Sequence, residues 1–300
     1  MSGGQVRVGT ASWTDPTLVR DTDWYPKKSM SAAERLRFYA SIFSMVEVDA
    51  TYYYPPTEDL AGKWTRRTPD DFRFDVKAYS LLTHHPTKRD SLWEDIAAAL
   101  PDEHAGKRTV YLHHLPDPAL ERAFAHFHAA LAPLYSAGKL GGVFFQFPPW
   151  FVASRDNRRY LESLPDRVAD YPLAVEFRHR SWLDGEGVRK TLDLLEHLGI
   201  AYVCVDGPQG FDSSVPPVTA VTADLAVVRL HGHNAGNWER KGITAAERFR
   251  YLYDTDELAG WVEPIRELAA QAAETHVVFN NCYRDYGVRN AQDMKRLLDG

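Results

Sequence analysis

The sequence predicts an α/β fold, a parallel (β/α)8 barrel of the TIM type, on two observations. Short apolar runs rich in β-branched and aromatic residues alternate with segments of helical periodicity along the whole chain. Eight of these runs are strand candidates, the number that closes such a barrel. No glycine-rich phosphate loop follows the first run, which disfavours an open doubly wound sheet. The predicted strands are residues 6–12, 44–51, 72–77, 141–147, 173–177, 201–205, 226–231 and 276–281.

The helices between these runs are predicted from their start signals and apolar spacing. Ser31 and Glu34 form a capping-box pattern, and apolar residues then recur at helical spacing, so we expect the first helix to run to about Ser44. The spacing predicts further helices at residues 58–67, 117–137, 155–164, 185–198, 257–274 and 290–298.

The longest connection lies between the third and fourth predicted strands. Residues 109–114 could add a strand there, and residues 91–100 have the pattern of a short helix. We interpret approximately residues 84–116 as an insertion on the barrel rather than as part of it. Because no Pro/Gly/Ser-rich linker divides the sequence, residues 1–300 are expected to form a single domain.

Composition limits the classes of protein to consider. The chain has 300 residues, of which 44% are hydrophobic and 25% charged, and this is typical of a globular protein. Its formal net charge of −6 argues against a protein that coats duplex nucleic acid through bulk positive charge. Cys204 and Cys282 have no partner at metal-ligand or redox spacing. With no leader-like N-terminus and no long apolar run, the chain is predicted to be cytoplasmic and not to span a membrane.

The fifth predicted strand places charge where a buried strand should be apolar. Side chains alternate across a strand, so Glu176 and Arg178 share one face while Val175 and Phe177 share the other. If the apolar face packs under helices, the charged pair must point into the barrel. Charged groups are rarely buried without partners, and this placement therefore marks a candidate site.

In barrels of this type, active sites lie at the C-terminal ends of the strands. Glu176 is the preferred general acid or base, with Glu47 or Asp49 as the second carboxylate, because paired carboxylates can hold different protonation states. Residues deep in a strand, such as Glu47, equally suit an internal salt-bridge lattice. The polar residues expected to bind a ligand at the mouth are Lys77, Gln146, Arg178, Arg229, His231, Asn280 and Asn281.

Aromatic residues follow several of the same strands. Such rings can stack on sugars or bases, although each could instead pack a loop onto the rim. The rings expected to contact a ligand are Trp13, Tyr53 and Trp182.

The loops after the seventh and eighth strands suggest an anion site. Gly232 permits close backbone approach beside Asn281, and a helix is predicted to start near Asn290. We therefore expect an anion to lodge between these loops, with Arg229 supplying positive charge.

A metal site is an open alternative, but it has no spacing signature of its own, so no metal or other cofactor is predicted. The dispersed residues that could form one are Asp49, Glu176, Asp206, His231 and His233.

At this point the chain resembles the DUF72, or YecE-like, family. The matching segments span nearly the whole chain, and the resemblance implies a TIM-type barrel without assigning a reaction. The sequence departs from the family mainly between about His84 and Pro116. The segments that carry the resemblance are Val8 to Trp13, Val46 to Asp49 with Tyr52 and Tyr53, Phe74 to Ala78, Phe145 to Pro149, Val175 to His179 with Ser181 and Trp182, Val228 to Gly232, and Phe279 to Asn281 with Asn290 and Ala291.

These observations predict a metal-independent enzyme, of hydrolase or isomerase type, that binds a sugar or nucleotide, in some cases phosphorylated. The alternative is a nucleic-acid-binding or nucleic-acid-processing protein in which rim aromatics stack bases. A non-catalytic scaffold would leave the polar mouth unexplained, and the sequence leaves the oligomeric state open. The phosphate contacts of the nucleic-acid alternative would be Lys88, Arg89, Arg155, Arg158, Arg159 and Arg180.

Overall fold

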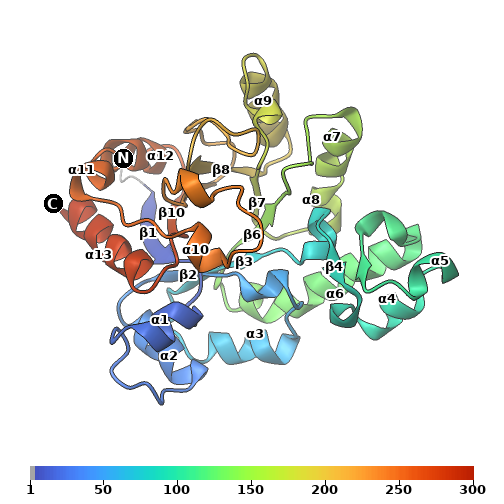
Figure 1. Ribbon diagram of the computed structural model, residues 1–300, viewed down its shortest axis with the longest axis horizontal. Helices are drawn as coiled ribbons and strands as arrows, with labels where there is room; N and C mark the ends of the chain where they lie inside the picture. The colour runs from blue at the N-terminus through green and yellow to red at the C-terminus, as the bar shows by residue number, and fades with distance from the viewer. Residues whose placement is uncertain (1–3) are drawn as a thin grey trace.

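The computed structural model describes residues 4–300 and shows an eight-stranded parallel sheet curled into a nearly closed barrel, with helices around its outer face (Figure 1). The strand order is β1-β10-β9-β8-β7-β6-β3-β2. An isolated parallel bridge between Ala11 and Glu47 joins the two ends of this order. The predicted barrel is confirmed. Its strands are β1 Gln5–Thr10, β2 Met45–Val48, β3 Arg73–Lys77, β6 Leu140–Gln146, β7 Leu173–Glu176, β8 Ala201–Asp206, β9 Leu225–Leu230 and β10 Glu274–Phe279.

All eight predicted strands occur, but the predicted bounds of the first, second and eighth are wrong by two or three residues, the eighth being β10 at Glu274–Phe279. The second strand ends at Val48 rather than at residue 51, because Ala50–Tyr52 turn into a 3-10 helix, η1. The first strand ends at Thr10, and Ser12 then adopts a positive φ of 69°. Asp49 therefore lies just beyond its strand, at the mouth of the barrel.

The helices form the outer layer (Figure 1). Ser31 caps α2 with the predicted capping box, although α2 ends at Ala40 rather than near Ser44. The predicted helix 257–274 is split at Gly260 and Trp261 into α11 and α12, and α13 starts at Tyr286, before the predicted residue 290. The helices of the barrel and its loops are α1 Pro16–Asp21, α2 Ala32–Ala40, α3 Glu58–Thr65, α6 Asp117–Ser136, α7 Arg155–Glu162, α8 Leu164–Arg167, α9 Gly187–His197, α10 Ala245–Arg248, α11 Thr255–Ala259, α12 Val262–Ala269 and α13 Tyr286–Asp299.

The segment after β3 forms the expected insertion. A two-stranded antiparallel sheet pairs β4 with β5, separately from the barrel sheet. In Figure 1 the insertion projects from one side of the barrel beside α6. Its elements are η2 Ser80–Thr83, β4 Thr87–Lys88, η3 Arg89–Ser91, α4 Glu94–Ala98, α5 Asp102–Ala105, β5 Thr109–Val110 and η4 Leu112–His114.

The strands are buried on both faces, as parallel strands in an α/β fold must be. Their outward side chains pack under the helices, whereas several inward side chains are charged. None of the helices in residues 4–300 has the length and apolar content needed to cross a membrane.

The charged side chains inside the barrel form two groups at different depths. Near the N-terminal ends of the strands, His276 lies 2.9 Å from Asp75 and 3.1 Å from Glu274, which also pairs with Arg7 and Arg73. The second group lies toward the C-terminal ends and leads into the candidate site.

Candidate functional site

A cavity of about 600 Å³ opens at the C-terminal ends of the strands, where the sequence analysis expects the site. Six of the predicted site residues line it: Asp49, Tyr53, Lys77, Gln146, Arg178 and Asn280. Seven do not line it: Trp13, Glu47, Glu176, Trp182, Arg229, His231 and Asn281.

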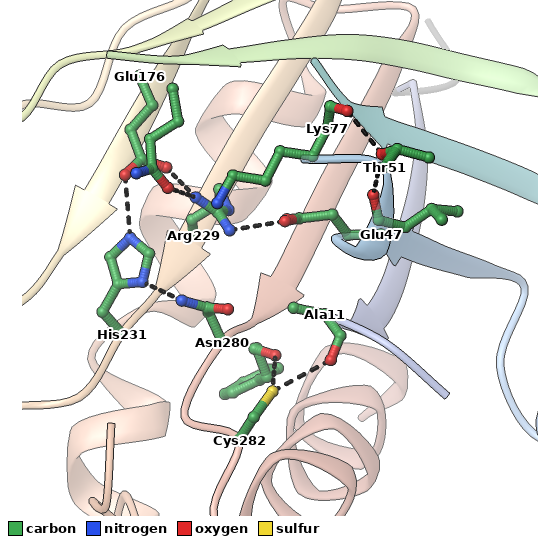
Figure 2. Close-up of polar contacts among 12 residues, drawn as sticks. Ala11, Glu47, Thr51, Lys77, Glu176, Arg229, His231, Asn280 and Cys282 are labelled. Atoms are coloured by element: carbon green, nitrogen blue, oxygen red, sulfur yellow. Dashed lines mark hydrogen bonds and ion pairs between the residues drawn. The ribbon is translucent and has the colours of Figure 1, made fainter. Parts of the chain in front are cut away.

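Beneath this cavity, Arg229 is held by two buried carboxylates (Figure 2). Its Nη2 donates to Glu47 Oε1 at 2.7 Å, and its Nη1 pairs with Glu176 Oε2. The same Nη1 lies 3.3 Å from Gln146 Oε1. Glu47 comes from β2 and Glu176 from the end of β7, two strands that β6 and β3 separate in the sheet. Arg229 is thereby neutralised inside the barrel, and its guanidinium is not free to bind a ligand at the mouth.

Arg178 links this buried group to the cavity. Its Nε pairs with Glu176 Oε1, and its Nη2 donates to His231 Nε2 at 2.9 Å. The guanidinium carbon lies 5.2 Å from the centre of the Trp238 ring, within the range of a cation–π interaction. Arg178 is 9% exposed and lines the cavity, so one edge of its charge faces the ligand space.

The two buried carboxylates are in different electrostatic environments. Burial opposes ionisation of Glu176, but Arg178 and Arg229 together hold its pKa well below the usual range. Burial raises the pKa of Glu47, which has Arg229 as its main cationic neighbour. Glu176 is therefore a fixed anion that orients two guanidinium groups, and it is poorly suited to donate a proton.

His231 is a neutral part of the same network. Burial and the neighbouring Arg178 lower its pKa to about 3. Its Nδ1 lies 2.8 Å from the side-chain amide of Asn280 (Figure 2), which lines the cavity as Arg178 does. His231 thus orients Arg178 and Asn280 rather than touching a ligand itself.

Lys77 and Asp49 form a second pair of polar groups at the mouth. Asp49 follows Val48 of β2, and Lys77 follows Val76 of β3. Because Val48 and Val76 are paired in the sheet, Asp49 and Lys77 lie at the ends of adjacent strands. Both are half-buried and line the cavity. Burial raises the pKa of Asp49, and burial together with Arg229 lowers the pKa of Lys77 to about 8.

These two groups are available to a ligand. Among residues 4–300, no side chain or carbonyl hydrogen-bonds or pairs with Lys77 Nζ, which lies 4.8 Å from the centre of the Tyr52 ring. The Asp49 carboxylate likewise accepts no hydrogen bond from another side chain in that part of the chain. The Lys77 carbonyl accepts from Thr51 Oγ1 at 2.6 Å, which fixes the end of β3 against η1.

The aromatic residues divide into cavity rings and structural rings. Tyr53 and Trp150 are each 57% exposed and line the cavity. Trp182 is fully buried, with its Nε1 donating to the Phe151 carbonyl at 2.6 Å. Trp13 is also buried, and its indole donates to a backbone carbonyl of α2. The expected ligand contacts of Trp13 and Trp182 are corrected accordingly, because both rings pack loops onto the rim.

At the expected anion site between the loops after β9 and β10, the Gly232 and Asn281 donors already have partners within the protein. The Gly232 N–H donates to Tyr253 Oη at 2.7 Å, so this donor is already used. The Asn281 amide donates to the Tyr251 carbonyl and to Asn290 Oδ1 and is fully buried. These loops bind each other, and the free cationic groups lie elsewhere in the mouth.

Several cavity residues were missed by the sequence analysis. Asp15 lies in the lining as the N-cap of α1, and Arg248 and Phe249 come from α10 and its C-terminal end. Sequence signals for both helices exist: Asp15 precedes a proline, and Thr244 with Glu247 makes a capping box. Helices this short have too little periodicity to be recognised.

Two further groups bear on the chemistry. In the part of the chain that the structure describes, no three His, Cys, Asp or Glu side chains gather as metal ligands would. Cys282 lines the cavity, but burial raises its thiol pKa well above the usual range, and its Sγ donates to the Ala11 carbonyl at 3.1 Å.

Comparison with known proteins places the chain among relatives that share its full length. The family model described as "Protein of unknown function DUF72" matches residues 7–300. The UPF0759 protein YunF of Bacillus subtilis is 31% identical over 298 residues, covering 98% of this chain and 95% of that protein.

Solved structures give the same result. A DUF72 family protein of Thermotoga maritima superposes with a TM-score of 0.75 at 31% identity, covering 99% of this chain and all of the other. A DUF72 family protein of Enterococcus faecalis gives a TM-score of 0.77 at 27% identity, covering 99% and 96% of the two chains.

Proposed function

This chain belongs to the DUF72 family, and from its site we propose that it is an enzyme that binds a small anionic molecule in the C-terminal mouth of the barrel and acts on it by acid–base chemistry. The observation that carries the proposal is the cavity in which Lys77 and Arg178 lie beside Asp49.

The charge balance favours an anionic ligand. Three cations, Lys77, Arg178 and Arg229, lie in or just below the cavity. Two buried carboxylates, Glu47 and Glu176, form salt bridges there with the arginines. Arg229 uses both carboxylates, and Arg178 shares one of them. Arg178 is therefore only partly neutralised, and Lys77 has no salt-bridge partner in residues 4–300, with Asp49 as the carboxylate beside them in the cavity. A phosphate or carboxylate group would pair with these cations, since guanidinium groups bind such anions well.

Asp49 takes the acid–base role that the sequence analysis gave first to Glu176. Its carboxyl group lines the cavity without a side-chain donor, and burial raises its pKa, which favours a carboxyl that gives as well as takes a proton. Glu176 instead positions Arg178. The exposed rings of Tyr53 and Trp150 provide apolar faces at the cavity edge on which a sugar or nucleotide ring could stack.

The nucleic-acid alternative has less support. Of the basic residues it requires, Arg159 pairs with Asp156 and Arg180 pairs with Asp212. Arg158 lies over the Trp182 ring, with 5.0 Å between its guanidinium carbon and the ring centre. These groups have protein partners, whereas Lys77 and Arg178 face a cavity.

Calorimetric titration with inorganic phosphate, a sugar phosphate and a nucleoside monophosphate tests the proposal. We expect wild-type protein to bind at least one of them, and Arg178→Met to bind it at least about tenfold more weakly, since a charge-assisted contact contributes about 1.5–3 kcal/mol. Arg155→Met, on exposed α7, is the matched control and should bind like wild type. Equal affinity in the Arg178 and Arg155 variants would refute the proposal.

A further inference from the structure

Lys77 differs from Arg178 and Arg229, the other cationic groups of the network below the cavity, in having no salt-bridge partner in residues 4–300. Arg178 and Arg229 are each held by Glu176, whereas the Lys77 ammonium pairs with no carboxylate in residues 4–300. Figure 2 shows its side chain extending from the end of β3 toward Arg229. An isolated amine that reaches a ligand cavity from a rigid strand has the geometry that nucleophilic catalysis requires.

The surroundings of Lys77 favour its neutral form. Its stem is partly buried, the Tyr52 ring covers one side, and Arg229 places a like charge nearby. With the pKa lowered to about 8, roughly half of the amine is neutral at pH 8, against well under 1% of an exposed lysine of pKa ≈ 10.4. Only the neutral amine has the lone pair that attacks an electrophile.

Asp49 provides the proton transfers that such an amine needs. It ends the strand adjacent to that of Lys77, lines the same cavity and has a pKa raised by burial. Arg178 lines the same cavity as a cation that could hold an anionic group of the substrate. The cavity thus brings together an amine, an acid–base group and an anion anchor.

We propose that Lys77 is a catalytic nucleophile that forms an imine with a small carbonyl compound carrying a carboxylate or phosphate, an inference that rests on the proposed function of the same site. The Nζ lone pair attacks the carbonyl carbon, and the carbonyl π electrons move to its oxygen, which takes a proton from Asp49. The nitrogen loses a proton to Asp49 to give a neutral carbinolamine.

In the second step, the nitrogen lone pair forms the C=N bond while the C–O bond breaks. Asp49 returns its proton to the departing oxygen, so that the products are one iminium group on Lys77 and one water molecule. Loss of the remaining N–H proton to Asp49 gives the neutral imine. No oxidant or reductant is needed, and the imine is an electron sink for chemistry at the adjacent carbon.

Reductive trapping tests this inference. Wild-type protein is incubated at pH 8 with pyruvate or dihydroxyacetone phosphate and sodium cyanoborohydride, which supplies the hydride that converts an imine into a stable secondary amine. Intact mass reports one adduct per chain, and peptide mapping locates it. We expect Lys77 to be labelled at least about tenfold faster than Lys241, an exposed lysine of the same cavity, because the lowered pKa of Lys77 leaves much of its amine neutral.

Two variants control for folding and for background reactivity. Lys77→Arg keeps the positive charge but has no nucleophilic amine, and it should lose the adduct while unfolding like wild type. Lys88→Arg removes an exposed lysine outside the cavity and should leave the adduct unchanged. Labelling spread over exposed lysines, or equal labelling of wild type and Lys77→Arg, would overturn the inference.

Failure of the inference can be told apart from failure of the proposed function. If pyruvate or dihydroxyacetone phosphate binds in calorimetry in an Arg178-dependent way but leaves no adduct on Lys77, then Lys77 is an ammonium ligand, and only the imine is refuted. If neither compound binds nor labels while phosphate still does, the substrate class is wrong. If no anion binds at all, both proposals fail together.

Discussion

Glu176 and Arg229 show how single residues set the properties of this site. Each is fully buried and ionised, and the two pair with each other, so neither charge could remain in the barrel alone. Strand alternation predicted the inward position of Glu176, and the sequence predicted a charge network with one or more of Arg178, Arg229 and Lys77. Arg178 and Arg229 are the two that pair with Glu176. The alternation of side chains along a strand predicts which face of the sheet a residue lies on. Which charged residue it pairs with depends on how far the side chains reach across the barrel.

The substitution Glu176→Gln should destabilise the protein by about 3–5 kcal/mol, because it leaves two buried guanidinium groups with one fewer carboxylate. Urea unfolding measures the effect. Glu186→Gln, which removes an exposed helical pair with Lys190, should change stability by less than about 0.5 kcal/mol. Equal stability of the Glu176 variant and wild type would show that the buried group does not hold the barrel together.

His276 gives a pH-dependent prediction in the group near the N-terminal ends. Burial opposes its protonation, but Asp75 and Glu274 overcome this effect and raise its pKa to about 9. A raised pKa favours the folded state while the group is protonated in the fold. This stabilisation is therefore complete below about pH 6.5 and is lost as pH rises through 9.

Unfolding free energies of wild type and His276→Gln, measured from pH 6 to pH 10, test this sign. We expect wild type to be more stable by about 3 kcal/mol at pH 6 and the difference to shrink as pH passes 9. Subtracting the unfolding free energy of the variant from that of wild type removes the contribution of titratable groups that the two proteins share. A difference that grows with pH would contradict the assignment of His276 as a buried cation between two carboxylates.

At the scale of elements, strands and long helices were predictable, and short loop elements were not. The barrel strands are buried on both faces, so each appears in the sequence as a short apolar run with its own boundaries. In contrast, η1 and α10 are one-turn elements whose positions depend on tertiary contacts. These elements and α1 bring Tyr52, Arg248 and Asp15 to the cavity. The sequence therefore predicted the lining residues at strand ends better than those from the short loop elements.

Gly232 shows how the loop after β9 is fixed. It has a φ of +82°, and a Cβ at this position would lie 2.4 Å from Tyr251 Cβ. Gly232→Ala should therefore destabilise the protein by about 2–4 kcal/mol, through the positive φ and overpacking combined. Gly138→Ala has a similar φ of +65° but open space around its Cβ, and it should cost only about 1 kcal/mol. Thermal unfolding of the two variants separates crowding from backbone strain, and equal losses would refute the packing role of Tyr251.

At the scale of the whole molecule, the barrel has a cavity at each end. The one at the C-terminal ends contains free cationic groups, and another of about 760 Å³ lies near the N-terminal ends beside Arg73 and Glu274, which pair with each other. The sequence places the candidate site at the C-terminal ends because strand ends and βα loops carry the polar residues in this fold. The sequence does not show that Gly232 and Asn281 already have hydrogen-bond partners within the protein, because those partners come from tertiary contacts.

The most direct test of the central claim is a crystal structure of the protein with inorganic phosphate or a small sugar phosphate. We expect the anion in the C-terminal mouth, in contact with Arg178 and Lys77 and within reach of Asp49, and we expect Arg178→Met crystals to show none at that position. An anion bound between the Gly232 and Asn281 loops, or in the cavity beside Arg73, would contradict the proposal that Lys77 and Arg178 form the ligand site.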